Sequence, residues 1–247
     1  MRVTWLGHAT VLIETAGGAR LLTDPLLRGR VAHLRRHAPL PAAPPRLDAI
    51  LISHVHHDHL DRPTLRRLGA GPAAGAAVVL PRGAAPLVAG LGLGAVAELA
   101  AGGHATVAGA DVEAVAAWHP TRRWPRSPQL DALGFVVEGT WFAGDTDLDE
   151  RMGALRGRVE VALVPVWGWG PSLGPGHLDP ERAARAVALV RPRIAIPIHW
   201  GTYLPYGLGR RHRDLLRAPA LQFAGHAATH APETRVELLA PGDALTV

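Results

Sequence analysis

A run of titratable side chains, HVHHDH at residues 54–59, follows the apolar stretch LDAILI. In an extended segment His54 and His56 point the same way, because side chains alternate with a period of two residues. The turn that follows can bring Asp58 and His59 round to a neighbouring point. Imidazole and carboxylate groups are typical zinc ligands, at about 2.0–2.2 Å from the metal. The run therefore predicts two adjacent metal sites that other segments complete.

Two further residues of this region are predicted to have other roles. His57 alternates away from the histidines beside it, so we expect it not to bind metal. Asp61 opens the stretch DRPTLRRLG, where we expect it to cap a helix that has Pro63 in its first turn.

Three more ligand candidates each follow a predicted strand. His119 comes after VEAVAAW, Asp145 after TWFAG, and His199 after RIAIPI. Polar residues at strand tips are where layered α/β proteins place their sites. Five histidines and two aspartates are enough for two sites if one aspartate bridges, because a shared carboxylate offsets the repulsion between dications about 3.5–4 Å apart.

With these residues in order, the sequence resembles the metallo-β-lactamase superfamily of dinuclear hydrolases. The segments TWLGHATVLIET, LLTDP, FAGDT and GPGHLDPERA are similar to the branch that contains ascorbate-phosphate lactonases and phospholipase-D-type N-acyl-phosphatidylethanolamine hydrolases. The resemblance covers essentially the whole chain. It implies an αββα sandwich, an α/β (α+β) fold of two mixed β-sheets flanked by helices, with the metals at one edge.

The resemblance also implies a role for each candidate residue. Metal 1 would be held by His54, His56 and His119, metal 2 by Asp58, His59 and His199, and Asp145 would bridge them. Asp24, in TDP, would lie behind the ligands and orient one of them. His8, in LGHAT, belongs to the branch's signature and would lie beside the site. His177, in GPGHLDPERA, would donate a hydrogen bond or a proton to the substrate. The chain departs from the antibiotic-hydrolysing enzymes that use a cysteine ligand, because it has no cysteine.

The loops around these residues carry aromatic and basic side chains. Trp118, Trp124 and Trp200 adjoin predicted ligands or the loop that follows, and are candidates for the wall of a substrate pocket. Arg122, Arg123 and Arg126 follow His119 on a proline-rich loop; they either recognise an anion or belong to a solvated loop.

The composition narrows the classes of protein that fit. The chain has 247 residues, a formal net charge of +5, and no cysteine or lysine. The missing lysine excludes Schiff-base chemistry and a Walker-type phosphate loop. Neither a membrane span nor a signal peptide is evident in the sequence, so we expect a cytoplasmic enzyme.

The elements that must position the candidates are mostly strands. Short strands are predicted near residues 2–7, 10–15 and 19–25, with a Gly17-Gly18 hairpin turn between the last two. Residues 26–46 are predicted to be a basic, proline-rich surface loop or lid with at most one helical turn. The later sequence alternates strands with helices over 147–157 and 179–192, and a terminal strand is predicted in ETRVELLAPGD. Two mixed sheets packed face to face, with helices outside, fit this order within a single domain over 1–247.

The predicted function is metal-dependent hydrolysis of an ester, lactone or phosphoester bond in a small, anionic substrate. Two divalent ions, zinc first with manganese or iron as alternatives, would generate a bridging hydroxide, and Asp58 would orient or deprotonate it. One rival is a phosphodiesterase acting on nucleic acid or phospholipid, with nucleic acid disfavoured; another is a metal-binding protein without activity. The sequence is compatible with a homo-oligomer.

Overall fold

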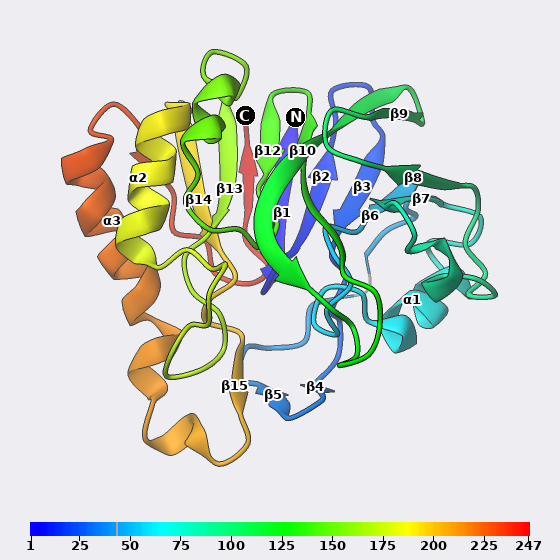
Figure 1. Ribbon diagram of the computed structural model, residues 1–247, viewed down its shortest axis with the longest axis horizontal. Coiled ribbons are helices and arrows are strands. Elements are labelled where there is room, and N and C mark those ends of the chain that lie inside the picture. The colour runs from blue at the N-terminus through cyan, green and yellow to red at the C-terminus, as the bar shows by residue number, and fades with distance from the viewer. Residues whose placement is uncertain (43) are drawn as a thin grey trace.

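Two seven-stranded mixed sheets form the centre of the computed structural model, which describes residues 1–42 and 44–247 (Figure 1). In sheet order, the first contains β17 (Ala244–Thr246), β1 (Arg2–Gly7), β2 (Thr10–Glu14), β3 (Arg20–Thr23), β6 (Ala49–Leu51), β7 (Ala77–Pro81) and β8 (Val96–Leu99). The second contains β16 (Arg235–Val236), β14 (Ile194–Ile198), β13 (Val161–Pro165), β12 (Thr140–Phe142), β11 (Leu130–Val137), β10 (Ala110–Thr121) and β9 (His104–Val107). A small third sheet contains β15 (Tyr203–Pro205), β5 (Leu34–Arg36) and β4 (Arg30–Val31).

Helices cover the outer faces of the two large sheets. The helices are α1 (Arg62–Gly69), α2 (Pro180–Val190) and α3 (Ala218–His230), with 3₁₀ turns η1 (Ala85–Leu87), η2 (Glu150–Leu155), η3 (Leu208–Arg210) and η4 (Arg213–Leu216). Leu65 of α1 packs on the first sheet, and Val187 of α2 and Phe223 of α3 pack on the second. These layers confirm the predicted arrangement of two mixed sheets flanked by helices.

The main core lies between the two sheets. Trp5 from the first sheet and Phe135 and Phe142 from the second are fully buried there. Apolar residues that alternate along each strand supply this layer, as expected for strands with one face turned to a partner sheet. The helix beginnings are also as predicted: the Asp61 carboxylate accepts from the Thr64 amide at 3.0 Å, and Asp179 accepts from the Arg182 amide at 2.8 Å.

Three parts of the fold differ from the sequence predictions. Within 26–46 the chain forms the strands β4 and β5, not a helical turn, because β5 pairs with the distant β15; Ala43 of this segment lies outside the described residues. The helix α3 was not predicted, since APALQFAGHAATH lacks a side-chain cap and a strongly apolar face. The predicted terminal strand is reduced to the short β16, and β17, which begins after it, pairs with β1. Among the described residues, no helix has the length and apolarity needed to cross a bilayer.

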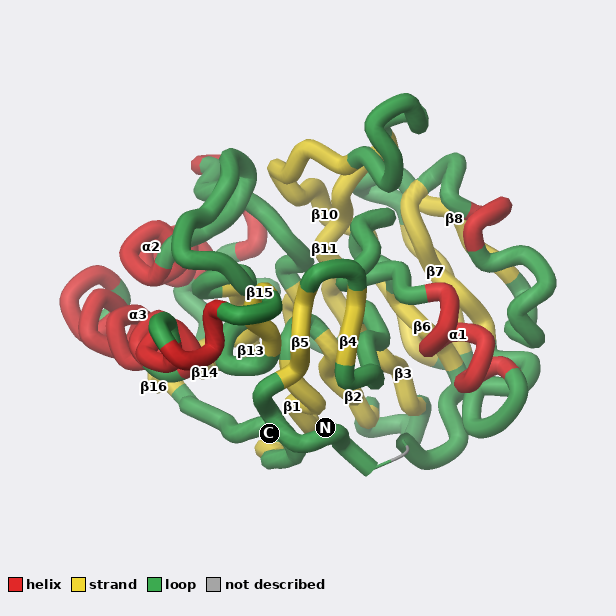
Figure 2. The backbone as a smooth tube through the Cα atoms, turned by 90° about the horizontal axis from the view of Figure 1, so that it is seen from below, coloured by secondary structure: helices red, strands yellow, loops and turns green. Residues whose placement is uncertain are grey.

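Strand direction explains why distant residues meet at one edge. β1 and β3 are each antiparallel to β2, and β3 is parallel to β6, so β1, β3 and β6 all end at the same edge. β12, β13 and β14 are parallel to one another in the second sheet. In Figure 2, which views the molecule from this side, the small sheet lies in front of the large ones.

Candidate metal centre

The first group of candidate ligands contains three histidines from two segments. His54 Nε2 lies 3.0 Å from His56 Nδ1, which lies 3.1 Å from His119 Nε2. His54 follows β6, and His119 lies near the end of β10, between Ala117 and Thr121, where the register with β11 shifts. The three nitrogens therefore converge on one point from both sheets.

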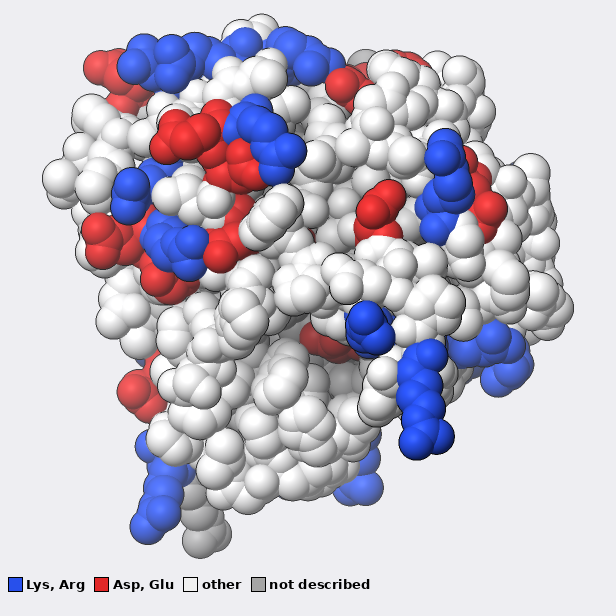
Figure 3. Space-filling view, in the orientation of Figure 1, with Lys and Arg blue, Asp and Glu red and all other residues white. Residues whose placement is uncertain are grey.

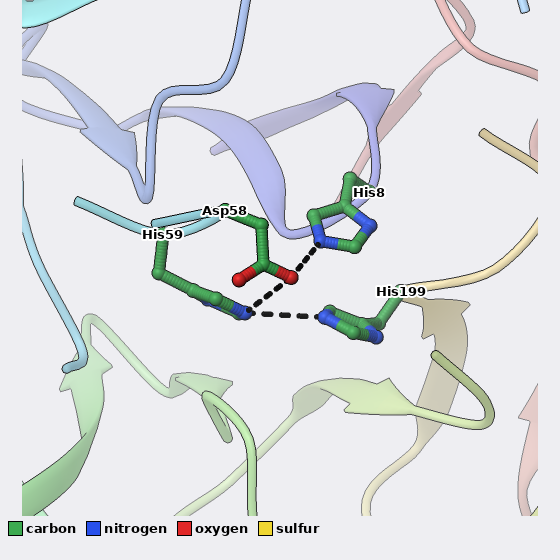
Figure 4. A group of neighbouring side chains, drawn as sticks. All are labelled: His8, Asp58, His59 and His199. Atoms are coloured by element: carbon green, nitrogen blue, oxygen red, sulfur yellow. Dashed lines mark hydrogen bonds and ion pairs between the residues drawn. The ribbon is translucent and has the colours of Figure 1, made fainter. Parts of the chain in front are cut away.

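The second group gathers around the ends of β1 and β14. His59 Nε2 lies 3.1 Å from His199 Nε2, and Asp58 Oδ2 lies 3.8 Å from His59 Nε2. The Asp58 carboxylate also faces His8 Nε2 at 3.0 Å, so His8 closes the group on one side (Figure 4). His8, His59 and His199 are all buried.

Asp145 lies between the two groups. One of its oxygens is 3.2 Å from His59 Nε2 and the other is 3.3 Å from His199 Nε2. The same carboxylate lies within 4.8 Å of the facing nitrogens of His119 and His177. The side chain is almost fully buried, and its Oδ1 has no hydrogen-bond partner among the described residues.

The outward nitrogen of each deeper histidine has a hydrogen-bond acceptor. His59 Nδ1 faces the Asp24 carboxylate at 2.7 Å, His119 Nδ1 faces the Gly176 carbonyl at 2.7 Å, and His199 Nδ1 faces the Trp167 carbonyl at 2.8 Å. An acceptor at Nδ1 places the proton there and leaves the Nε2 lone pair directed into the centre.

His54 is oriented through Ser53. The Ser53 hydroxyl donates to Asp24 Oδ2 at 2.5 Å, so its oxygen accepts from His54 Nδ1 at 3.0 Å. The Ser53 amide donates to the other Asp24 oxygen at 2.7 Å. One buried carboxylate, Asp24, therefore orients a histidine of each group.

The donor set fits metal ions. Imidazole nitrogens of the first group face one another at 3.0–3.1 Å. His54 and His119 hold their protons on the outer Nδ1 atoms, so their Nε2 lone pairs point into the centre. In a tetrahedral site with bonds of about 2.0–2.1 Å, ligand nitrogens lie about 3.3 Å apart. A cation in each group would remove the repulsion and would also satisfy the orphaned Asp145 oxygen.

Three residues of the centre have left-handed backbones. His8, Asp24 and His199 have φ values of 55°, 33° and 62°. The His8 conformation is held by its amide, which donates to Thr202 Oγ1 at 2.8 Å, and by its carbonyl, which accepts from the His199 amide at 2.9 Å. Such conformations cost energy and cluster at functional sites, so the backbone geometry supports a functional role for this edge.

Burial keeps most of these histidines uncharged. It lowers the pKa of His54 well below the usual range, with His59 adding to the effect. Burial and the neighbouring His119 lower the pKa of His56 to about 4. Burial, helped by His8 and opposed by Asp145, lowers the pKa of His199 to about 3. These histidines carry free lone pairs at neutral pH, as metal binding requires.

His59 behaves differently because carboxylates surround it. Burial opposes its charge, but Asp145, Asp58 and Asp24 together raise the pKa of His59 well above its usual value. In return, His59 holds the pKa of Asp58 well below the usual range, and His199 and His59 do the same for Asp145, in both cases against the effect of burial. Without metal the His59 proton balances this negative charge, and a dication would take its place.

The sequence model of the protein family described as "Beta-lactamase superfamily domain" matches residues 19–200 of the chain. This chain belongs to the metallo-β-lactamase superfamily. It is 34% identical over 217 residues to a UPF0173 metal-dependent hydrolase of Methanopyrus kandleri, covering 83% of this chain and 86% of that protein. It is 30% identical to a UPF0173 metal-dependent hydrolase of Nitratidesulfovibrio vulgaris, covering 100% and 95% of the two chains.

Solved structures agree on the fold of this superfamily member. Igni18, a metallo hydrolase of Ignicoccus hospitalis, superimposes with a TM-score of 0.72 at 19% identity, over 99% of this chain and 97% of that one. The protein is accordingly a metal-dependent hydrolase of the metallo-β-lactamase fold.

The remaining predicted residues of the hydrolase divide into those near the centre and those directed elsewhere. His177 Nε2 lies 3.7 Å from Asp145 Oδ2, and the His177 and His119 rings meet edge to face at 4.6 Å. His57 turns away and meets the Trp124 ring at 4.6 Å. Trp200 differs from its predicted place beside the pocket.

The Trp200 ring packs against another tryptophan. It stacks on Trp5 at 5.2 Å, and its indole N–H donates to the Pro197 carbonyl at 2.8 Å. The ring is partly buried and packs against the core residues of both the inter-sheet layer and the layer under α2 and α3. By contrast, Trp118 and Trp124 are 61% and 59% exposed, which leaves their rings accessible.

Two residues that position the ligands of the hydrolase were not predicted from sequence. Ser53 joins Asp24 to His54, and its place between a buried strand and the first ligand was the available signal. Arg123 donates from Nη1 to the carbonyls of Val55 at 2.8 Å and Leu60 at 3.0 Å. This guanidinium therefore binds backbone carbonyls at the two ends of the HVHHDH loop.

Asp24→Asn is expected to weaken metal binding by about 10–100-fold, the usual effect of losing a partner behind a metal ligand. The asparagine N–H₂ can face the His59 and Ser53 donors, and His59 then loses the acceptor that holds its proton on Nδ1. Competition with a chromophoric chelator would measure the affinity. Asp48→Asn, which changes an aspartate bonded to the Arg20 amide, is the matched control. Equal affinities in the Asp24 variant and the wild type would contradict the positioning role.

The metal-free hydrolase is expected to lose stability as the pH falls from about 6.5 to 4. Unfolded histidines take up protons near pH 6.5, whereas the folded pKa values of His56 and His199 are about 4 and about 3. The unfolded chain therefore binds more protons in this window, and the free energy of unfolding falls by about 1.4 kcal/mol per pH unit for each group. His59, with its raised pKa, is protonated in both states there and does not offset the loss.

Urea unfolding of chelator-treated protein at pH 6.5, 5.5 and 4.5 measures this loss. A free energy of unfolding that stays constant or rises across these three values would contradict the predicted charge states.

Proposed function

We propose that the hydrolase uses two divalent cations to cleave an ester, lactone or phosphoester bond of a small anionic substrate. His54, His56 and His119 would hold one cation, Asp58, His59 and His199 the other, and Asp145 would bridge them. Zinc is the first choice, and manganese or iron also suits a set of nitrogen and oxygen ligands.

The observation that carries this proposal is the convergence of lone pairs. Two sets of imidazole nitrogens approach within 3.0–3.1 Å of one another, and the buried Asp145 carboxylate joins the sets. A solvated histidine-rich turn would have no reason to bring together side chains from four separate segments, at β6, β10, β12 and β14.

The protein's own groups have distinct tasks in this proposal. When bound, the cations would lower the pKa of water and polarise the bond under attack. The pKa of Asp58 lies well below its usual range, so this carboxylate is ionised and accepts a hydrogen bond from the attacking water. His8 holds Asp58 in place at 3.0 Å.

His177 is placed to handle the leaving group. Its Nδ1 donates to the Gly174 carbonyl at 3.1 Å, which turns Nε2 toward Asp145 and the centre. The side chain is 24% exposed, so Nε2 can exchange a proton with both substrate and solvent.

Two features support an anionic substrate. The formal net charge is +5, and Arg122 and Arg126 are exposed on the loop that follows β10. The segments LGHAT and GPGHLDPERA favour the branch with ascorbate-phosphate lactonases and N-acyl-phosphatidylethanolamine hydrolases, and we propose a bond of the kinds these enzymes cleave.

A substrate panel tests the reaction class. Metal-loaded protein would be assayed on lactones, phosphodiesters, phosphomonoesters and thioesters, with the Asp58→Ala protein as the control for contaminating enzymes. Turnover of one class by the wild type alone is expected. Equal, background rates for the two proteins on every class would contradict the proposed function.

A further inference from the structure

A long cavity lies outside the proposed centre, on the outward side of the second sheet. It has a volume of about 760 Å³ and runs along β10 from Glu113 to His119. The six residue-to-residue steps along this strand span about 20 Å. The volume is in the range of sites that bind small molecules, about 300–1,000 Å³. We call this cavity the β10 trough.

Small side chains make the trough. Val115 and Ala117 point outward from β10, because the alternate residues Val112 and Ala114 belong to the inter-sheet core. Ala117 pairs with Ala132 of β11, so two methyl groups stand where larger side chains would fill the space. Met152 and Leu155 of η2 form an apolar wall.

Most of the charges at the rim are paired; Asp131, which also lines the trough, is exposed and has no ion-pair partner among the described residues. Arg158 forms an ion pair with Glu113 at one end of the trough, and Arg151 pairs with Asp149 toward the other. The Arg151 guanidinium also lies over the exposed Trp118 ring at 5.7 Å from its centroid. A rim of mostly paired charges over an apolar floor favours an uncharged, apolar occupant.

The trough ends at the segments that deliver candidate ligands. His119 and Gly176 both line it, and they share the 2.7 Å hydrogen bond that orients the His119 ring. Thr146, the residue after Asp145, lines the same end. In Figure 1 β10 lies at the front of the molecule, and Figure 3 shows, on this face and below the end of β10, a hollow with acidic side chains at its floor.

From this continuity we propose that the β10 trough is a substrate subsite, which binds an uncharged apolar group, an alkyl chain or an aromatic ring, attached to the bond cleaved at the centre. The proposal rests on the proposed metal centre and adds to it. The substrate is then amphiphilic: its hydrolysable, anionic end lies at the metals, and its apolar arm lies along Ala117 and Ala132.

Hydroxamates of increasing length test the subsite without relying on turnover. Isothermal titration of metal-loaded protein would compare acetohydroxamate, hexanohydroxamate and octanohydroxamate, which share one metal-binding headgroup. Because a buried methylene contributes up to about fourfold in affinity, octanohydroxamate is expected to bind at least about 30-fold more tightly than acetohydroxamate.

Two tryptophan variants locate the effect. Ala117→Trp fills the trough and is expected to remove the gain from chain length while leaving acetohydroxamate binding unchanged. Ala228→Trp, on the exposed side of α3, is the matched control and should keep the full gain. Ala117→Leu, a smaller obstruction, replaces the first variant if that protein does not fold.

Three results of these titrations would contradict the proposal. Equal affinities for long and short hydroxamates in the wild type would overturn the subsite. This holds even if 1-octanol by itself binds in the trough, because the trough would then bind a separate molecule and not an arm of the substrate. A gain that survives in both Ala117 variants would also overturn it. If no hydroxamate binds, including acetohydroxamate, the metal centre itself fails and the subsite with it.

Discussion

Asp58→Ala is expected to lower kcat/KM at least about a thousandfold on the substrate that the panel identifies. The change removes a proposed ligand of the second cation and the carboxylate that orients the attacking water, and help of that second kind alone is typically worth 10²–10⁴-fold. Asp58 is the partner of His8 at 3.0 Å, so the variant also leaves a buried imidazole without its acceptor. Steady-state kinetics of reconstituted protein would measure the loss.

His57→Ala is the matched neighbour control for that prediction. Its ring contacts Trp124 and lies outside the groups of side chains that converge on the candidate metal positions. We expect less than about a tenfold loss, because a partly exposed contact is removed and no ligand is lost. Comparable losses in the two variants, with circular dichroism spectra unchanged, would contradict the assignment of alternate residues in the HVHHDH run to different roles.

His177→Ala is expected to lower kcat at least about a hundredfold, the lower range for general acid–base help. The loss should appear in kcat more than in KM, because proton transfer to the leaving group acts mainly in the transition state. His177 is not needed to complete either proposed ligand set, so metal content and Tm should change little. His104→Ala, an exposed histidine on β9, is the control.

The metal content of the His177→Ala variant also tests whether His177 is a metal ligand. Its facing nitrogen lies close enough to those of His119 and Asp145 to share a cation with them. If the variant loses a metal ion, His177 is a ligand and the proton-transfer role is wrong. If the variant keeps both metals and a near-normal kcat, His177 is a packing residue.

The sequence predicted the elements whose signals are local. Helices α1 and α2 begin at capping aspartates, and Asp145 and His199 follow the buried strands β12 and β14, whereas His119 lies within β10. Such signals depend on period and on the chemistry of a few neighbouring residues, so they are visible without a structure.

The remaining features depend on contacts between distant segments. β5 exists as a strand because it pairs with β15, about 170 residues later, and α3 is held by burial of Phe223 against the second sheet. Within the centre, the carbonyls of Gly176 and Trp167 orient histidines, and a backbone carbonyl has no residue type that could signal its role. Trp200 was placed wrongly because adjacency to His199 in sequence does not fix where a ring packs.

Metal stoichiometry tests the central claim most directly. Protein stripped with chelator would be reconstituted separately with zinc, manganese and iron, desalted, and analysed for metal per chain by elemental mass spectrometry. Two sets of converging ligands joined by Asp145 predict about two ions per chain for at least one of these metals. One ion per chain would contradict the dinuclear arrangement, and less than about half an ion with every metal would contradict the metal centre altogether.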